Sequence, residues 1–396
     1  MMRYYLAGNF VLKRLETPSL YNISNDELYE LDETAFEFLK KCARTEGCDA
    51  GGADKEFIGY CVSEGVLSAE RQSKSFTQFI PLKLSFCGPS LRYLELQITD
   101  KCNLKCKHCY IDQGAGNELP VEIIRNVLDE FESMQGLRLL ITGGEPLMRG
   151  DFGAVNALLP LYGFRKILFT NGLLLDKALL EKLNVDEIQF SVDGMEQGHD
   201  ALRGKGTYKK VMRALEISLV SGITVSIATM VHSRNIGEFA VMEKLFRGMG
   251  IEDWTVDVPC VTGHLKHNTF FHVPADVAGQ YLNYGFGGGI HGGGEGYACG
   301  LHLLSVLANG TVAKCAFYSH SPLGTVSEGL GKCREGLKPV KLESLQCAAL
   351  SCRAIDSCRG GCRYRASIGP DMGAGEQTGR DIYKCFSYDI IKGNGS

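Results

Sequence analysis

Apolar and polar residues follow a regular strand–helix rhythm between residues 91 and 259. Short β-branched runs alternate there with longer amphipathic stretches, which predicts parallel strands joined by right-handed crossovers. The repeats are fewer than the eight of a closed barrel. We therefore expect an α/β fold built as a partial, TIM-like (β/α)6 barrel. The six expected strands are LRYLELQIT, LRLLIT, KILFT, EIQFSV, TVSIATMV and DWTVDV.

The segment before this region has a different pattern. LYNISNDELYEL alternates apolar and polar residues around Ser24-Asn25-Asp26, which predicts a β-hairpin. DETAFEFLKKCA predicts a helix with Asp32 at its N-cap, and DKEFIGYCVSEGVL predicts a second short helix. We therefore expect a small winged-helix-like module over residues 1–75, followed by a polar linker.

The last segment loses the strand–helix rhythm. It is rich in Gly and Cys, and its pattern predicts little secondary structure. Such a segment is organised by bound metal rather than by a large apolar core. The predicted domains are 1–75, 76–259 and 260–396.

Composition narrows the class of protein. The 396 residues are 44% hydrophobic and 22% charged with a net charge of −4, so we expect neither nucleic acid nor an anionic membrane surface as a partner. The first residues lack the pattern of a signal peptide, and no apolar run reaches the roughly 20 residues that span a bilayer. These features predict a cytoplasmic protein.

Sixteen cysteines are unusual for such a chain. In a reducing compartment, clustered thiols are metal or cluster ligands more often than disulfides. Four cysteines lie outside any ligand spacing, and we expect them to be buried small apolar side chains: Cys42, Cys48, Cys61 and Cys87. His264 and His267 lie among polar residues and are expected at the surface.

Three cysteines follow the first predicted strand, where chemistry is located in α/β sheets. QITDKCNLKCKHCY places Cys102, Cys106 and Cys109 in CxxxCxxC spacing. Three thiolates on one loop can bind three irons of a [4Fe–4S] cluster and leave the fourth iron open to a reacting ligand. The alternative is a zinc knuckle with His108 as the fourth ligand.

CNLKCKHCY, with Tyr110 after the third cysteine, resembles the signature of the radical S-adenosylmethionine (SAM) superfamily. The resemblance covers nearly the whole chain. It implies that Cys102, Cys106 and Cys109 hold the catalytic cluster of an oxidoreductase. Such a cluster cleaves SAM reductively to a 5′-deoxyadenosyl radical, which abstracts a hydrogen atom from the substrate.

Motifs at later strand ends also match this family. ITGGEPL resembles the GGEP element that contacts the SAM amino group, since glycines allow close backbone approach and a carboxylate complements an ammonium. FTNGLLL, FSVDG and HDALRGKGTY resemble the loops that contact the ribose, the methionine portion and the carboxylate of SAM. The resemblance therefore implies SAM contacts from Tyr110, Gly143, Gly144, Glu145, Pro146, Asn171, Ser191, Asp193 and Arg203.

The C-terminal cysteines resemble the SPASM extension, which carries two auxiliary [4Fe–4S] clusters. Cys299 and Cys315 bracket Gly310 as C-x10-G-x4-C, and CAALSCRAIDSCRGGC follows. The resemblance assigns Cys299, Cys315 and Cys362 to the first auxiliary cluster. It assigns four further cysteines to the second auxiliary cluster: Cys347, Cys352, Cys358 and Cys385.

Two points of the auxiliary pattern stay open. Four residues separate Cys347 from Cys352, whereas the family pattern has two. The fourth ligand of the first auxiliary cluster is Cys260 or Cys333, or that iron is open to substrate. The alternative is a pair of structural zinc ions, because C-x4-C and C-x3-C also suit zinc ribbons.

Many SPASM enzymes that resemble this chain form thioether or carbon–carbon cross-links in ribosomally made peptides. The resemblance implies a precursor-peptide maturase, of which the geopeptide type is one subfamily, with a donor such as flavodoxin or ferredoxin. An exposed hairpin edge in the first 75 residues would bind the leader of the precursor as an added strand. Alternatively, this module only covers the barrel.

Other functions remain as alternatives. One is an anaerobic sulfatase-maturase type of enzyme that oxidises a Cys or Ser of a protein, and another is a tetrapyrrole side-chain enzyme. A non-enzymatic alternative is a cluster-binding scaffold, which would form no 5′-deoxyadenosine. The sequence does not identify a general base.

Overall fold

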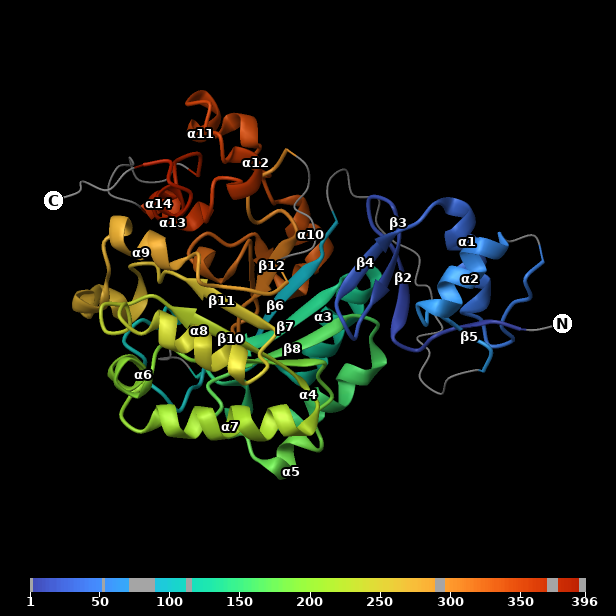
Figure 1. The fold of residues 1–396 in the computed structure, drawn as a ribbon, viewed down its shortest axis with the longest axis horizontal. Helices are drawn as coiled ribbons and strands as arrows, with labels where there is room; N and C mark the ends of the chain where they lie inside the picture. Colours follow the sequence, from blue (N-terminus) through green and yellow to red (C-terminus); the bar gives the residue numbers. More distant parts are fainter. Residues whose placement is uncertain are drawn as a thin grey trace.

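The chain folds around one large mixed β-sheet (Figure 1). The computed structural model describes residues 3–51, 54–70, 90–111, 116–288, 296–368 and 377–391. Within these residues, a small N-terminal module lies on one side of the sheet and the C-terminal segment lies above it (Figure 1). None of the helices in the described ranges is both long and apolar enough to cross a bilayer.

Six parallel strands form most of the central sheet, and they match the six expected strands in chain order. Their bounds are β6 Tyr93–Thr99, β7 Arg138–Gly143, β8 Arg165–Thr170, β9 Glu187–Ser191, β10 Thr224–Met230 and β11 Asp253–Asp257. The crossover helices are α3 Val121–Ser133, α4 Phe152–Leu158, α5 Lys177–Leu180, α6 Glu196–Arg203, α7 Thr207–Ser221 and α8 Phe239–Gly248.

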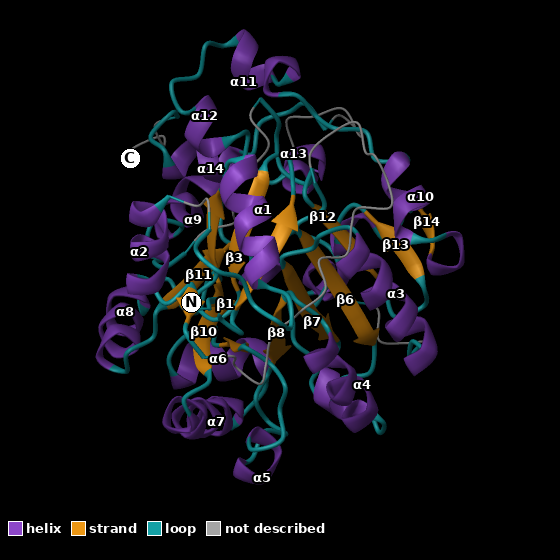
Figure 2. Ribbon diagram, turned by 90° about the vertical axis from the view of Figure 1, so that its right-hand side faces the viewer, coloured by secondary structure: helices purple, strands orange, loops and turns teal. Residues whose placement is uncertain are grey.

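The helices α3, α4, α7 and α8 lie along the outer side of this sheet (Figure 2). Alternate residues of β6, namely Leu94, Leu96 and Ile98, pack into the apolar core beside α3. Because side chains alternate across a strand, Glu95 and Gln97 face the opposite side of the sheet. Polar groups are thereby directed toward the concave interior.

The C-terminal segment extends the same sheet. The sheet order is β11-β10-β9-β8-β7-β6-β12-β13-β14, with β12 (Leu303–Val306) parallel to β6. Strands β13 (Thr311–Ala313) and β14 (Gly324–Thr325) follow antiparallel. Our expectation of little secondary structure here is wrong, because strands this short carry too little alternation to be recognised. The helices of this segment are α9 Ala275–Tyr281, α10 Leu330–Glu335, α11 Gln346–Ala349, α12 Ile355–Cys358, α13 Arg363–Ile368 and α14 Ile382–Ser387.

The N-terminal module contains the predicted hairpin and both predicted helices. The Asp32 side chain accepts a hydrogen bond from the Ala35 N–H (2.7 Å) and caps the first helix, as expected. The predicted end of the module at residue 75 lies outside the described residues. The module consists of β2 Phe10–Arg14, β3 Pro18–Asn22, β4 Glu27–Glu30, α1 Glu33–Cys42 and α2 Lys55–Ser63, with β1 Tyr5–Leu6 paired to β5 Leu67–Ser68.

The module packs against the amino ends of β6, β7 and β8. Leu137, directly before β7, is buried among Val11, Tyr21 and Ile23 of the module. Arg165, the first residue of β8, donates from Nη1 to the carbonyl oxygens of Ile23 and Ser24, at 2.6 Å each. The cysteine loop follows the other end of β6, so the module and this loop lie at opposite ends of the parallel strands.

Two cysteines of the module form a disulfide, Cys42–Cys48. Cys42 ends α1, and Cys48 pairs through its backbone with Tyr4, so the fold brings the two thiols together. Both cysteines are buried as expected, but the disulfide between them was not predicted. Cys61 is a buried free thiol as expected, and Cys87 lies outside the described residues.

Candidate active site

The loop of Cys102, Cys106 and Cys109 lies at the carboxyl end of β6 and is held by two distant segments. The Lys107 N–H donates to the carbonyl oxygen of Leu202 at the end of α6 (2.9 Å). The His264 N–H donates to the carbonyl oxygen of Cys109 (2.8 Å), and His264 Nδ1 lies 2.9 Å from that of Cys106. The surface expectation for His264 is therefore wrong, since its ring supports the loop.

The three thiols are neighbours and are removed from water to different degrees. Cys106 is buried, whereas Cys102 and Cys109 are half-buried. Burial raises the pKa of Cys102 to about 11, and the neighbouring Cys106 and Cys109 thiols add to the shift. The Leu104 N–H donates to Cys102 Sγ (3.4 Å), a contact that favours the thiolate.

The GGEP glycines make room for the cysteine loop itself. A Cβ on Gly143 would lie 2.1 Å from the carbonyl oxygen of Thr99, and one on Gly144 would lie 2.3 Å from that of Lys101. The Gly144 N–H donates to the Thr99 carbonyl oxygen (2.9 Å). These glycines therefore let the end of β7 touch the backbone of the cysteine loop, and Pro146 opens the short helix η1 (Pro146–Met148) behind them.

Glu145 is a buried carboxylate beside this loop. Its two oxygens accept from the Thr170 hydroxyl and the Asn171 N–H, at 2.8 Å each. Burial raises the pKa of Glu145 to about 7, against the effect of these donors. The carboxylate is thus prepared to accept a further cation.

Asn171 links Glu145 to the cysteine loop. Its Nδ2 donates to Asn103 Oδ1 (2.7 Å) and lies 4.0 Å from Cys102 Sγ. Glu145, Asn171 and Cys102, predicted from separate motifs, therefore meet at the carboxyl ends of β6, β7 and β8. Ser191, another predicted residue, is the last residue of β9 and is half-buried.

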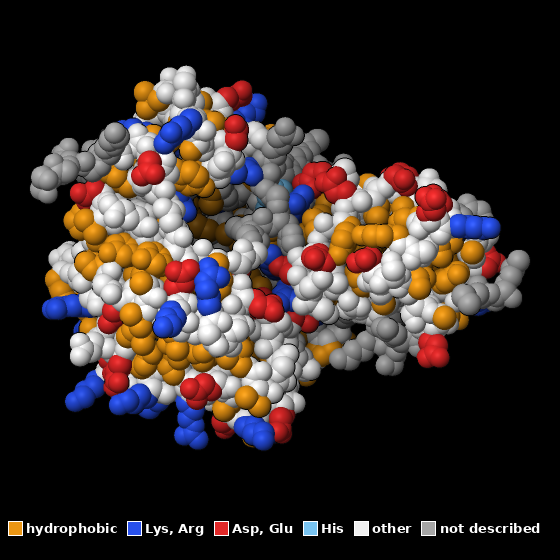
Figure 3. Space-filling view, viewed as in Figure 1, with side chains coloured by type: hydrophobic (Ala, Val, Ile, Leu, Met, Phe, Trp, Pro, Cys, Tyr) orange, Lys and Arg blue, Asp and Glu red, His pale blue; other side chains and the backbone are white. Residues whose placement is uncertain are grey.

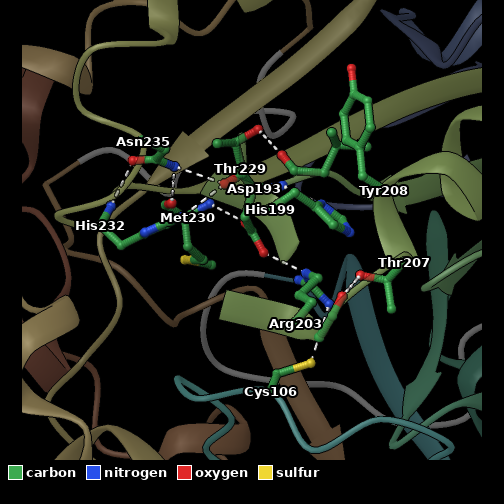
Figure 4. A network of polar contacts seen from close by, with 12 residues as sticks. Cys106, Asp193, His199, Arg203, Thr207, Tyr208, Thr229, Met230, His232 and Asn235 are labelled. Atoms are coloured by element: carbon green, nitrogen blue, oxygen red, sulfur yellow. Dashed lines mark hydrogen bonds and ion pairs between the residues drawn. The ribbon is translucent and has the colours of Figure 1, made fainter. Parts of the chain in front are cut away.

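A buried ion pair joins Asp193 to Arg203 (Figure 4). Asp193 accepts from Arg203 Nε at 2.5 Å and from the Met230 N–H at 2.7 Å. Burial would raise the pKa of Asp193, but the Arg203 guanidinium outweighs it and holds this pKa well below its usual range. Arg203 Nη1 lies 3.8 Å from Cys106 Sγ. Both carboxylate oxygens of Asp193 thus have protein partners, and the ion pair holds the Arg203 guanidinium beside the cysteine loop.

His108, the fourth ligand of the zinc alternative, is turned toward a different set of groups. The charged residues that act on it most strongly are Asp193 and Arg203, and burial lowers its pKa to about 4. Its buried Nδ1 has no hydrogen-bond partner among the residues that the structure describes. The imidazole of His108 is therefore directed toward the Asp193–Arg203 pair, as its strongest electrostatic partners show.

Tyr110 connects the cysteine loop with the C-terminal segment. Its hydroxyl donates to Glu95 Oε1 (3.3 Å), and its ring centroid lies 4.6 Å from that of Phe317. Glu95 also accepts from the Ser305 hydroxyl, and burial raises its pKa. Sequence reasoning missed Glu95, although a carboxylate inside an apolar strand was a usable signal.

The four cysteines assigned to the second auxiliary cluster line one hollow: Cys347, Cys352, Cys358 and Cys385. The unusual spacing of the first pair is accommodated by the turn after α11, in which the Cys352 N–H donates to the Cys347 carbonyl oxygen (3.0 Å). Cys347 therefore lies with the other three thiols despite its departure from the family pattern.

Cys260 joins the cysteines assigned to the first auxiliary cluster. Its thiol is hydrogen-bonded to that of Cys362, and Cys299 and Cys315 are electrostatic neighbours of Cys362. Cys333, the other candidate, is buried in the core beneath β6 and lies 3.5 Å from the Thr325 carbonyl oxygen. Only one of the two candidate ligands thus lies among these thiols.

Backbone N–H groups point at several of these sulfur atoms. Phe317 donates to Cys315, Gly360 to Cys358 and Arg365 to Cys362. Hydrogen bonds to cysteine sulfur are characteristic of iron–sulfur sites, where they set the reduction potential. The donor sets therefore fit [4Fe–4S] clusters.

The contact between Gly144 and the cysteine loop generates a prediction. In Gly144→Ala, the added Cβ must displace the backbone of Lys101, so we expect the loss of about four irons per chain and of SAM cleavage. Iron analysis and 5′-deoxyadenosine assays after anaerobic reconstitution measure both effects. Gly150→Ala, whose Cβ meets nothing within 4 Å, is the matched control. Full iron content in Gly144→Ala would contradict the steric argument.

Known proteins are similar to this chain over different lengths. Fe-coproporphyrin III synthase of Methanosarcina barkeri is 30% identical over 192 residues, 47% of this chain and 47% of that protein. The chain thus spans about half the length of this relative. Mycofactocin maturase MftC of Mycolicibacterium smegmatis is 27% identical over 302 residues, 68% of this chain and 77% of that protein.

The fold is similar to that of SuiB from Streptococcus suis. The crystal structure of SuiB bound to S-adenosylmethionine matches with a TM-score of 0.65 and 16% identity, over 94% of this chain and 99% of that one. SuiB bound to its precursor peptide SuiA matches with the same TM-score. The model of the radical SAM superfamily matches residues 96–246, which contain the cysteine loop and the strand ends described above. Residues 96–246 of this chain are therefore similar to the domain that defines the radical SAM superfamily.

Proposed function

We propose that the chain is a radical SAM enzyme that oxidatively cross-links a ribosomally made precursor peptide, through a thioether or carbon–carbon bond. One observation carries this proposal: the likeness to SuiB extends over 94% of the chain, including the N-terminal module. The mycofactocin maturase also aligns with 68% of the chain. A peptide substrate accounts for the parts of the chain outside the catalytic domain.

A tetrapyrrole substrate is the second candidate, because Fe-coproporphyrin III synthase has the higher identity. Its similarity covers 192 residues, a length close to that of the catalytic domain alone. Similarity of this extent supports common SAM chemistry more than a common substrate, because function depends on the site rather than on the fold.

In the proposed site, the three thiolates hold a [4Fe–4S] cluster, which with SAM supplies the 5′-deoxyadenosyl radical. Glu145 would bind the SAM ammonium through a charge-assisted hydrogen bond. Arg203, fixed by Asp193, would provide positive charge beside Cys106 and the SAM carboxylate. Asn171 would hold the Cys102 side of the loop. A flavodoxin or ferredoxin would supply the electron.

The C-terminal thiols would hold two auxiliary clusters. Cys347, Cys352, Cys358 and Cys385 serve the second cluster in this proposal. Cys299, Cys315 and Cys362 serve the first, with Cys260 as its fourth ligand. The segment of Cys260 is fixed to that of Cys362 by Arg365, whose Nη1 donates to Asp257 Oδ1 (2.6 Å) and to the Val258 carbonyl oxygen (3.1 Å).

The leader of the precursor would dock on the edge of β4. Among described residues, β4 pairs with β3 alone. Its Tyr29 lies near the exposed Tyr60 of α2, on a face where Figure 3 shows hydrophobic side chains bordered by acidic ones. An added peptide strand would gain backbone hydrogen bonds there. The exposed Glu27 and Glu30 favour a leader that carries Lys or Arg.

This docking site constrains the precursor. The module lies at the amino ends of the strands, and β6 alone has seven residues, a length of about 23 Å. At most about 3.5 Å of chain is gained per extended residue, so at least roughly seven residues must separate the docked leader from the modified position.

The function is tested by co-expressing the chain without oxygen with short peptides encoded beside its gene. We expect mass spectrometry to find a loss of two hydrogens per modified site, absent with Cys102→Ala. An unmodified peptide together with abundant 5′-deoxyadenosine would retain the radical chemistry and reject the peptide substrate. The same assay with a tetrapyrrole then examines the second candidate.

The raised pKa of Glu145 predicts a pH dependence of SAM binding. Below its pKa of about 7 the carboxyl group is protonated and must lose a proton to pair with an ammonium. We therefore expect SAM affinity to fall by up to about tenfold per pH unit below pH 7. Equilibrium binding of SAM to the reconstituted chain measures this effect.

Two variants control this experiment. Glu145→Gln should bind SAM roughly 10–100-fold more weakly with a flat pH profile, as expected for a lost hydrogen bond between charged groups. Glu181→Gln removes an exposed carboxylate and should retain the wild-type profile. Wild-type binding that does not change between about pH 6 and 8 would reject the role of Glu145.

The assignment of Cys260 is tested against Cys333. Cys260→Ala should weaken the first auxiliary site, so that iron falls from about twelve toward about eight per chain, and its electron paramagnetic resonance (EPR) signal should change. Cys333→Ala should change neither quantity. Both variants should still form 5′-deoxyadenosine, since neither residue touches the catalytic loop. Unchanged iron and EPR signals in Cys260→Ala would reject the assignment.

A further inference from the structure

Arg363 is a buried cation for which no carboxylate partner exists among the described residues. It follows Cys362 and begins α13, and its side chain is 1% exposed. Its Nη1 donates to the carbonyl oxygens of Gln377 (2.9 Å) and Gly379 (2.7 Å), which satisfies one end of the guanidinium. Its Nε and Nη2 are buried and have no hydrogen-bond partner within the described ranges.

Arg365, two residues further on, is also buried, but its charge is paired with carboxylates. It forms ion pairs with Asp257 (2.6 Å) and Asp381 (2.8 Å). A guanidinium remains charged in a protein, and leaving it buried without a negative partner is strongly unfavourable. Among the described residues, no carboxylate supplies the negative charge that the Nε–H and Nη2–H groups of Arg363 lack.

Arg363 acts on thiols of both predicted auxiliary sites. Its backbone N–H donates to Cys299 Sγ, and its charge acts on the Cys299 thiol. The charge also acts on Cys347, which belongs to the second set. A Cβ on Gly360, which lines the hollow of that set, would lie 2.8 Å from Arg363 Nη2, so the guanidinium lies next to the hollow. A side chain that is adjacent to both sets can neutralise both, and bound clusters with four thiolates would supply the missing negative charge.

We propose that Arg363 is the shared counter-cation of the two auxiliary clusters, with Nε–H and Nη2–H donating to cluster sulfur. This inference rests on the auxiliary clusters of the proposed function. One-electron reduction adds negative charge to a cluster, so a nearby cation and its hydrogen bonds favour the reduced form. Arg363 thereby raises the reduction potentials of both clusters, which makes them better electron acceptors.

The test uses the full chain with Cys102, Cys106 and Cys109 replaced by Ala, so that only auxiliary clusters contribute to the signals. In this background, Arg363→Met removes the charge and the donors, whereas Arg363→Lys keeps the charge with fewer fixed donors. Lys341→Met, which removes an exposed cation of the same segment, is the control. Iron content and EPR-monitored redox titration are measured for each variant.

We expect about eight irons per chain and a shift of both midpoint potentials to more negative values in Arg363→Met. Arg363→Lys should shift them less, and Lys341→Met should not shift them. If Arg363→Met does not assemble clusters, the midpoint potentials of Arg363→Lys test the inference instead. A shift to more negative values supports the role of Arg363 as a donor to the clusters, and wild-type potentials overturn it.

Two other outcomes overturn the inference in distinguishable ways. Full iron content with unshifted potentials in Arg363→Met rejects the role of Arg363 and leaves the proposed function intact. A shift of only one cluster rejects the shared position. Absence of auxiliary clusters in the chain that retains Arg363 rejects the cluster assignment of the proposed function, and this inference with it.

Discussion

The proposed cysteine sites require negatively charged sulfur away from water, and the buried basic side chains of the structure bear on this constraint. Burial raises the pKa of Cys102 to about 11 and that of Cys315 to about 12, yet the thiolate is the form that binds metal. Buried basic side chains supply positive charge that favours the thiolate form. Arg203 lies beside Cys106, and Lys314 and Arg363 are the basic groups that act on Cys299. The thiols of Cys106 and Cys299 thus each lie within the electrostatic reach of a basic side chain.

The ion pair between Asp193 and Arg203 shows how such a cation is positioned. A buried ion pair adds little to stability by itself, because desolvation offsets much of the attraction. Here the ion pair fixes the position of the Arg203 guanidinium. Asp193 is fixed by the Met230 N–H of β10, and the loop of Cys106 is fixed by the carbonyl oxygen of Leu202, next to Arg203. The end of α6 therefore positions both the guanidinium and the loop that it faces.

Local patterns were sufficient to predict the centre of the molecule. The six parallel strands are apolar runs of five to seven residues, and the spacing of Cys102, Cys106 and Cys109 lies within one loop. Such features depend on residues close together in the sequence, so they can be recognised without the fold. The Asp32 cap and the β3–β4 hairpin belong to the same class.

The features that sequence reasoning missed depend on residues far apart. Strand β12 is recognisable only through its pairing with β6, which lies about two hundred residues earlier. The choice between Cys260 and Cys333 required the contact with Cys362, and the Cys42–Cys48 disulfide required the pairing of Tyr4 with Cys48. Arg363 resembles Arg365 in sequence, and only their different partners distinguish the two.

The number of thiols in each auxiliary set determines whether a substrate could bind to an iron of the proposed clusters. With Cys260 as a ligand, each auxiliary set has four thiols, and neither set leaves an iron free to bind a substrate thiol. In the proposed function, electron acceptance, favoured by the charge of Arg363, is then the role of these clusters. Glu95 is a buried carboxylate that accepts hydrogen bonds from Tyr110 and Ser305 and acts electrostatically on Cys315. Through Tyr110, it therefore links the loop of Cys102, Cys106 and Cys109 with the first auxiliary set.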